Sequence, residues 1–181
     1  LASLYEDQKR FPQAEAILRE GFKVLPDHID LHYGLGILFE KTGRFEECIA
    51  AMRTILKQDP DHADALNFIG YLYADRGIHL EEAERMIKRA LELKPGNAYM
   101  IDSLGWVYFR TNRLAEAIRY LKEASEALPE DAAILEHLGD AYVRVGQASE
   151  AMEAYGRAAR LNPENAALRK KLDDLLKKKT P

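Results

Sequence analysis

Apolar residues recur at helical spacing through the chain, in pairs of segments that are each about a dozen residues long. In the first segment of a pair, an apolar residue precedes a glycine, and an aromatic residue lies three positions after that glycine. In the second segment, a small residue is followed four positions later by a larger apolar residue. Both spacings place their residues on one face of a helix. The pattern therefore predicts pairs of amphipathic helices that pack against one another.

Prolines end these pairs at an almost constant interval. Pro26, Pro60, Pro95, Pro129 and Pro163 are separated by 34, 35, 34 and 34 residues. This period is typical of solenoids of helix pairs, in which each unit buries its apolar face only against its neighbours. The chain divides accordingly into a partial unit at 1–26, full units at 27–60, 61–95, 96–129 and 130–163, and a final helix at 164–181.

Four glycines share one register in the first helices of the full units. They are Gly36, Gly70, Gly105 and Gly139. A glycine inside a helix costs about 1 kcal/mol relative to alanine, so its return at this register predicts a close crossing with the second helix. The expected partner at that crossing is the small residue of the second helix, which is Cys48, Ala83, Ala117 or Ala151.

The breaks between helices carry signals of their own. A residue suited to the left-handed conformation follows each first helix, and these residues are Gly43, Gly77, Asn112 and Gly146. Side chains that can accept hydrogen bonds from a helix start follow the prolines, and these are Asp27, Asp61, Asn97, Asp131 and Asn165. We expect the extra residue of the 35-residue unit to lie in the turn from Gly77 to Leu80.

The order L-G-x-x-Y, then a small residue, a larger apolar residue and a proline, resembles the tetratricopeptide repeat family from Leu1 to Pro163. The resemblance implies an all-α fold, a right-handed α-solenoid of helix-turn-helix repeats whose first helices line a concave groove. One apolar stripe in the last segment predicts a capping helix for this solenoid. The stripe consists of Leu168, Leu172, Leu175 and Leu176.

The second half of the chain resembles a narrower group. From Gly70 to Gly146, segments such as R-A-L-E-L-K-P-G-N-A and D-S-L-G-W-V-Y-F-R are similar to the C-terminal repeats of bacterial tetratricopeptide lipoproteins that act as envelope adaptors. This resemblance favours a bacterial, envelope-associated (periplasmic) location over the cytoplasm, although the residues themselves leave the compartment open.

The first unit begins at a mid-helix position, because Leu1 occupies the leucine position of a repeat. We expect the sequence to be part of a longer chain, with an apolar edge around Leu1, Leu4 and Tyr5 that could join copies into a homo-oligomer. No apolar run of about 18 residues is present, so we expect no direct membrane insertion of this part.

The charge of the chain bears on its binding partners, and its single cysteine bears on its chemistry. The net charge is −4; six basic and three acidic residues lie from Glu164 onward, leaving 20 basic and 27 acidic residues before it. Such an acidic repeat region disfavours nucleic-acid binding. The one cysteine, Cys48, stands where other units have alanine, which indicates a buried packing residue rather than a reactive thiol.

Catalysis and metal binding find little support in the sequence. His28 and His32 are four residues apart, a possible metal-ligand spacing, but they have no third positioned ligand. His28 recurs as His62 in the next unit, which favours a structural role. No phosphate-binding glycine loop is present. We therefore expect no enzyme activity, no cofactor and no metal.

The candidate binding residues lie on the face of the first helices that, in the family, lines the groove. They are Tyr33, Ile37, Asp64, Asn67, Phe68, Tyr71, Asp75, Tyr99, Asp102, Trp106, Phe109, Arg110, His137 and Asp140. This set is aromatic in the middle and acidic at its edge, which suits an apolar or basic peptide segment. Tyr71 and Trp106 have two interpretations, exposure in the groove, which we favour, or packing between adjacent first helices.

Two known ligand classes of the family lack their residues here. The lysines, asparagines and arginine that clamp the C-terminal carboxylate of Hsp70 or Hsp90 are replaced by residues such as Tyr33, Phe68 and Ser103, and the asparagine ladder of the sugar-transferase solenoids is absent. The leading hypothesis is a protein-binding adaptor or scaffold. A self-assembling scaffold comes second, and a regulatory solenoid attached to an enzyme comes third.

Overall fold

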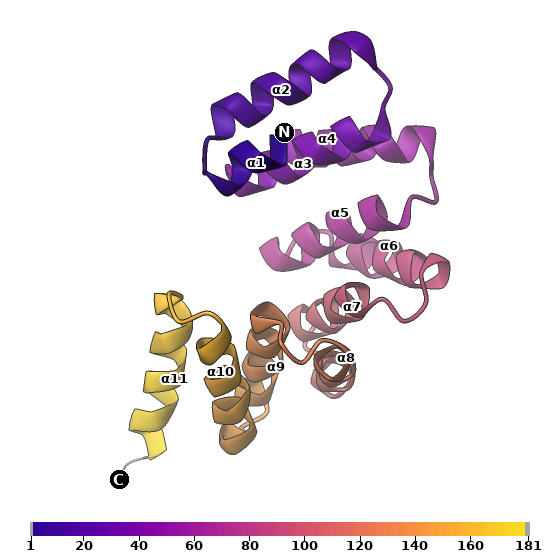
Figure 1. Cartoon of the computed structure of the whole chain (residues 1–181). Coiled ribbons are helices and arrows are strands. Elements are labelled where there is room, and N and C mark those ends of the chain that lie inside the picture. The colour runs from indigo at the N-terminus through magenta and orange to yellow at the C-terminus, as the bar shows by residue number, and fades with distance from the viewer. Residues whose placement is uncertain (1, 180–181) are drawn as a thin grey trace. The chain divides into compact units, whose positions relative to one another are not determined.

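The computed structural model of the chain describes residues 2–179, which form eleven α-helices and no β-strand (Figure 1). The helices are α1 (Ala2–Asp7), α2 (Phe11–Val24), α3 (Ile29–Lys41), α4 (Phe45–Gln58), α5 (Ala63–Arg76), α6 (Leu80–Leu93), α7 (Ala98–Arg110), α8 (Leu114–Ala127), α9 (Ala132–Arg144), α10 (Ala148–Leu161) and α11 (Ala166–Lys179). The odd-numbered helices up to α9 are the first helices of the predicted pairs. The all-α solenoid class predicted from the repeat is confirmed.

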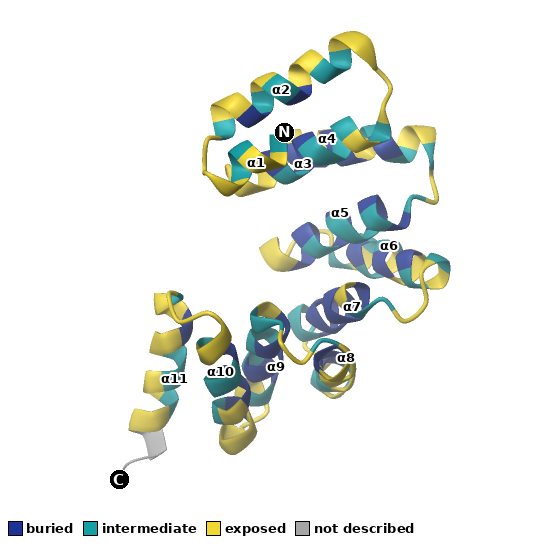
Figure 2. Ribbon diagram, viewed as in Figure 1, coloured by how far each residue is buried: buried dark blue, intermediate teal, exposed yellow. Residues whose placement is uncertain are grey.

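The chain forms two compact units, divided within α5 between Ile69 and Gly70. In unit 1, which runs to Ile69, α1 packs on α2, α2 on α3, and α3 on α4. In unit 2, which starts at Gly70, α6 packs on α7, and each following helix packs on the next through to α11. Figure 2 shows the buried residues as stripes along the helices, and α7 is covered on most sides.

The glycine register marks close helix crossings, as predicted. A Cβ added to Gly70 would lie 2.6 Å from Ile87 Cγ1, and one added to Gly105 would lie 2.7 Å from Leu121 Cγ. The nearest partner is therefore the larger residue of the second helix, not the small one. The small residues, which are Cys48, Ala83, Ala117 and Ala151, are fully buried one turn earlier.

The predicted helix stops are confirmed by their backbone angles. Gly43, Gly77 and Gly146 have φ values of 73°, 69° and 77°, and Asn112 has 61°. Between this left-handed residue and the next helix lies a single residue in the other full units, such as Arg44 before α4. Two residues lie between Gly77 and α6, and the second, His79, is also left-handed at φ 48°.

The helix starts differ in part from the prediction. Asn97, Asp131 and Asn165 accept hydrogen bonds from the first turns of α7, α9 and α11, as expected. Asp27 and Asp61 stand one residue too early to do so, because the capping position is the second residue after the proline. His62 fills it for α5, where its Nδ1 accepts from the backbone N–H of Ala65 at 3.2 Å.

The last helix packs through most of its predicted stripe. Leu168 is fully buried in a cluster with Leu135, Tyr155 and Ala158, and Leu172 and Leu175 pack against that cluster. Leu176 is 49% exposed. The stripe thus packs on α10 from Leu168 to Leu175, which is the covering role that we expected of a cap.

Candidate functional site

The predicted binding residues lie on one stripe of the first helices, which we call the first-helix face of each unit. In unit 1 this face joins Tyr33 of α3 to Phe68 of α5, with ring centroids 5.9 Å apart in an edge-to-face contact. Tyr33 also lies 6.2 Å from the ring of His62. Ile37, Asp64 and Asn67 are half-buried on the same helices. Unit 1 therefore presents a partly covered aromatic pair.

In unit 2 the same face is built around Trp106 of α7. Its ring stacks on Phe109 at 4.7 Å and on His137 of α9 at 4.3 Å, with interplanar angles of 13° and 21°. Tyr71 of α5 lies 6.2 Å from the His137 ring. Trp106 is only 7% exposed, so it packs between first helices, and the exposure that we favoured for it is not found. Tyr71 is half-buried.

A buried ion pair supports this stack. The His137 Nδ1 lies 3.0 Å from both carboxylate oxygens of Asp102, which is itself 6% exposed. Burial lowers the pKa of His137, but the neighbouring Asp102 carboxylate, with Asp140 and Glu136, raises this pKa by more, so the net shift is upward. Asp102 thus holds the imidazole against the Trp106 ring and favours its protonated form.

The carboxylates of α9 are neutralised by the last helix. Lys171 of α11 contacts Glu136 and Asp140, in both cases at 2.8 Å. The Tyr155 hydroxyl also donates to Asp140. Burial lowers the pKa of Lys171, but its bonds to Asp140 and Glu136 raise this pKa by more, which gives a net increase. The acidic edge predicted for this face is therefore largely satisfied within the chain.

Two arginines lie beside the stacked rings of Trp106 and Phe109. Arg110 donates to the Asp75 carbonyl oxygen at 2.6 Å, and its guanidinium lies 6.0 Å from the Trp106 ring centroid. Arg144 lies 5.1 Å over the Phe109 ring and donates to the Asn112 side-chain oxygen. Their positions on successive repeats fix both guanidinium groups beside aromatic rings.

One aromatic residue of this face is left open to solvent. Tyr99, at the start of α7, is 58% exposed. Ser103, one turn later, donates its hydroxyl to the Tyr99 carbonyl oxygen. Asp75 is exposed, and Phe109 is half-buried. The accessible rings of the face in unit 2 are therefore the exposed Tyr99 and the half-buried Phe109 and Tyr71.

One regularity of register explains these pairings. The fifth residue of a first helix contacts the sixth residue of the next one, as in Tyr33–Phe68 and Asp102–His137. Glu136–Lys171 repeats the relation between α9 and α11. The roles of Lys171 and of the His137 ion pair were missed because the register was not extended into the last helix or applied between repeats.

The described residues contain no group of three or more histidine, cysteine, aspartate or glutamate side chains arranged to hold a metal ion. His28 is the residue before α3, and His32 lies against the Phe22 ring at 4.7 Å. Within residues 2–179, no helix is both long and apolar enough to cross a membrane.

Comparison with family models identifies the repeat. Two family models, both described as tetratricopeptide repeat, match residues 1–70 and 72–179. The chain belongs to the tetratricopeptide repeat family. Members of this family generally mediate protein–protein interactions and are generally non-catalytic scaffolds. No curated protein matches the sequence.

Solved structures of tetratricopeptide repeat proteins share the fold. A thermophilic TPR protein of Thermus thermophilus is 22% identical with a TM-score of 0.81, over 97% of this chain and 95% of that one. PilW, a widely conserved type IV pilus biogenesis factor, is 19% identical with a TM-score of 0.81, over 97% and 83%. A chain of the APC/C hetero-tetramer Cut9–Hcn1 is 18% identical with a TM-score of 0.90, over 98% and 35%.

Proposed function

We propose that this protein is a non-catalytic adaptor or scaffold that binds a peptide segment of a partner protein on the first-helix face of unit 2. The observation that carries the proposal is Tyr99, an aromatic side chain 58% exposed on a face whose other rings are buried or half-buried. Aromatic residues with a fixed neighbourhood and a free ring are frequent anchors of protein interfaces. Tyr71 and Phe109, both half-buried, extend the apolar surface available to a ligand.

The charges of this face favour an apolar ligand over a basic one. Asp102 is paired with His137, and Glu136 and Asp140 are paired with Lys171. A basic ligand could reach these carboxylates only by displacing His137 or Lys171, and displacing the buried His137 leaves its charge unpaired at high cost. We therefore propose an apolar segment as the ligand here, and Asp75 remains the one predicted acidic position of unit 2 that is exposed on this face.

The experiment is selection of a displayed random-peptide library against the whole chain, followed by affinity measurements on the selected peptides. We expect Tyr99→Ala to weaken binding about tenfold or more without changing the melting temperature. Leu161→Ala is the matched control, because Leu161 is an exposed apolar residue at the end of a second helix, at 43%. Selected peptides that bind Tyr99→Ala and Leu161→Ala equally well would contradict the proposed face.

Self-association is the second candidate, and exposed apolar residues of unit 1 favour it. Leu4, Val24 and Leu25 are 54%, 78% and 52% exposed, while Leu1 lies outside the described residues. If copies join through these residues, sedimentation velocity will show a concentration-dependent dimer that Leu4→Ser, Val24→Ser removes. A monomer at all concentrations would leave the adaptor as the remaining proposal.

A further inference from the structure

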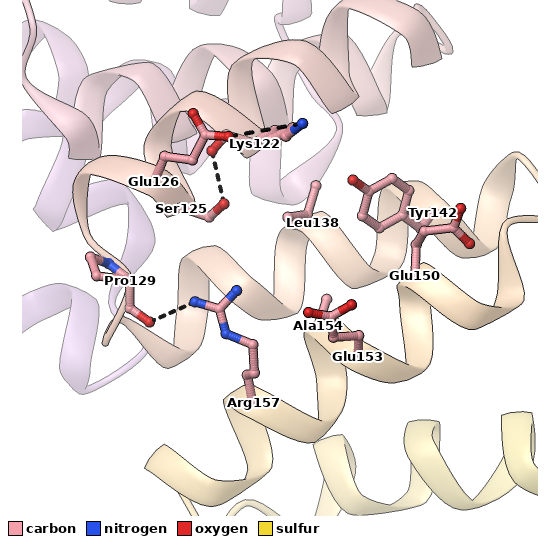
Figure 3. Close-up of a pocket in the computed structure, with 10 residues that line it drawn as sticks. All are labelled: Lys122, Ser125, Glu126, Pro129, Leu138, Tyr142, Glu150, Glu153, Ala154 and Arg157. Atoms are coloured by element: carbon pink, nitrogen blue, oxygen red, sulfur yellow. Dashed lines mark hydrogen bonds and ion pairs between the residues drawn. The ribbon is translucent and has the colours of Figure 1, made fainter.

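A cavity of about 400 Å³ lies between α8 and α10, with α9 as its floor (Figure 3). Its volume falls within the range of known ligand sites, roughly 300–1,000 Å³. Leu138 and Ala154, which are both 5% exposed, form its apolar base. The half-buried Tyr142 ring adds an aromatic wall.

This cavity is separate from the first-helix face. Its α9 residues, Leu138 and Tyr142, are one turn apart, whereas His137 and Asp140 belong to the first-helix face. At 3.6 residues per turn, the two stripes point roughly 150° apart around α9. A ligand in the cavity therefore leaves the Trp106 stack untouched, so this inference does not rest on the proposed function.

The two ends of the cavity carry opposite charge. Figure 3 shows Tyr142 and Glu150 at one end, and Pro129 with Arg157 at the other. Arg157 donates to the Pro129 carbonyl oxygen at 3.1 Å. Glu150 and Glu153 are exposed on successive turns of α10, and among the described residues neither makes a hydrogen bond or an ion pair.

The unpaired carboxylates create a negative potential at this end. Burial raises the pKa of Tyr142, and Glu150, Glu153 and Glu126 raise it further. Like charges three residues apart on a helix also repel one another. A cation placed between them would relieve that repulsion, and Lys122 of the same cavity is instead paired with Glu126 of α8 at 3.9 Å.

We propose that the cavity between α8 and α10 receives an arginine side chain of a partner protein, held between the Tyr142 ring and the Glu150 and Glu153 carboxylates. A guanidinium group stacks on an aromatic face and donates to two carboxylates at once, which a lysine ammonium does less well. At the other end, Arg157 is placed to donate to a main-chain carbonyl oxygen of the same ligand.

The test is a titration of the whole chain with the capped pentapeptide Gly-Ser-Arg-Ser-Gly, followed by NMR of the Leu138 and Ala154 methyl groups. The control peptide carries citrulline, which keeps the shape of arginine without its charge. We expect saturable shifts of both methyl signals with the arginine peptide only. Glu150→Gln, Glu153→Gln should weaken binding about tenfold, the sum of two partly exposed charge pairs.

A charge-matched control separates this site from general attraction to an acidic protein. Glu123→Gln, Asp173→Asn removes two exposed carboxylates outside the cavity and should leave the affinity unchanged. Tyr142→Leu keeps an apolar wall and should weaken binding about threefold through loss of stacking. The proposal is overturned by equal shifts with citrulline, by equal weakening in both carboxylate variants, by shifts confined to Trp106, or by no shift.

Discussion

The first-helix faces of unit 1 and unit 2 share one register and differ in chemistry. The fifth residue of one first helix meets the sixth residue of the next in both units. In unit 1 this contact is the Tyr33–Phe68 ring pair, and in unit 2 it is the Asp102–His137 ion pair. The repeat backbone decides which positions meet, while the side chains decide whether the contact responds to protons and salt.

The same contrast appears one turn later, at the ninth position of each first helix. Ile37 is half-buried in unit 1, whereas Trp106 is 7% exposed in unit 2. Unit 2 has thus turned part of a potential binding face into an interior, and it leaves Tyr99 as the exposed ring. A repeat protein can therefore present different surfaces from equivalent positions without changing its backbone plan.

Substitutions at the ninth position of the first helices should have the largest effect on stability. Trp106→Ala should lower the free energy of unfolding by about 3–5 kcal/mol, because it opens a cavity between rings that stack on both sides. Ile37→Ala should cost about 1 kcal/mol, because that side chain is only half removed from water. Urea denaturation followed by circular dichroism measures both. A smaller loss of unfolding free energy for Trp106→Ala than for Ile37→Ala would contradict the difference in burial between the two units.

Substitutions of the glycines at the helix crossings should have the second-largest effect on stability. A Cβ on Gly105 would meet Leu121 Cγ at 2.7 Å and the Leu121 backbone nitrogen at 3.1 Å, so Gly105→Ala should cost about 1–3 kcal/mol. At Gly36 the nearest atom is the flexible end of Met52, and its movement is offset by the roughly 1 kcal/mol helix preference of alanine. Thermal melting should separate the two variants; equal melting temperatures would mean that both crossings relax alike.

Proton binding provides the third test. Since the pKa of His137 is raised in the folded chain, the Asp102–His137 pair stabilises unit 2 fully below the unfolded value near 6.5 and loses this contribution as the pH rises through the raised pKa. The Tyr33–Phe68 contact of unit 1 has no such dependence in this range. The free energy of unfolding of unit 2, measured by urea denaturation at a series of pH values, should therefore fall as the pH rises from 5.5 to 8.5.

Asp102→Asn is the control for that pH dependence, because it keeps the side-chain shape and removes the charge. In this variant, the His137 imidazole signals should titrate at lower pH in an NMR experiment, and the decline of stability should flatten. An unchanged His137 titration would show that Asp102 is not the cause of the raised pKa.

The smallest effect should be the same in both units. Glu15 contacts Arg44 at 2.7 Å in unit 1, and Glu84 contacts Arg113 at 3.0 Å in unit 2. Each pair is partly exposed, so Glu15→Gln and Glu84→Gln should each cost about 0.2–1 kcal/mol. The loss should disappear in about 1 M salt, where the screening length is near 3 Å. A loss that persists in salt would point to packing instead.

Much of the fold followed from residues that break or crowd helices. The prolines, the left-handed Gly43 and Asn112, and the buried glycine register are local properties, so their consequences can be read along the chain. The capping error at Asp27 and Asp61 came from counting one residue short after the proline. The exposure of Trp106 was mispredicted because it depends on Phe109 and His137 together, and a helix pattern does not show how fully rings stack.

The cavity between α8 and α10 could not be predicted from the sequence. Its walls come from Glu150 and Arg157 on one helix and from the Pro129 turn, which is fixed by helix packing rather than by spacing in the sequence. Even so, the acidic surplus of the repeat region was visible from composition alone. What the sequence did not reveal is which carboxylates are used internally and which are left unpaired.

The contacts of Lys171 set a boundary for any peptide that lies along unit 2. Its ammonium group occupies, on α11, the place next to α9 where a ligand side chain would otherwise reach Glu136 and Asp140. A peptide bound along unit 2 would therefore compete with Lys171 of this protein for Glu136 and Asp140. Its favourable contacts would end near His137. If the proposed peptide binds here, the last helix limits how many of its residues can contact this face.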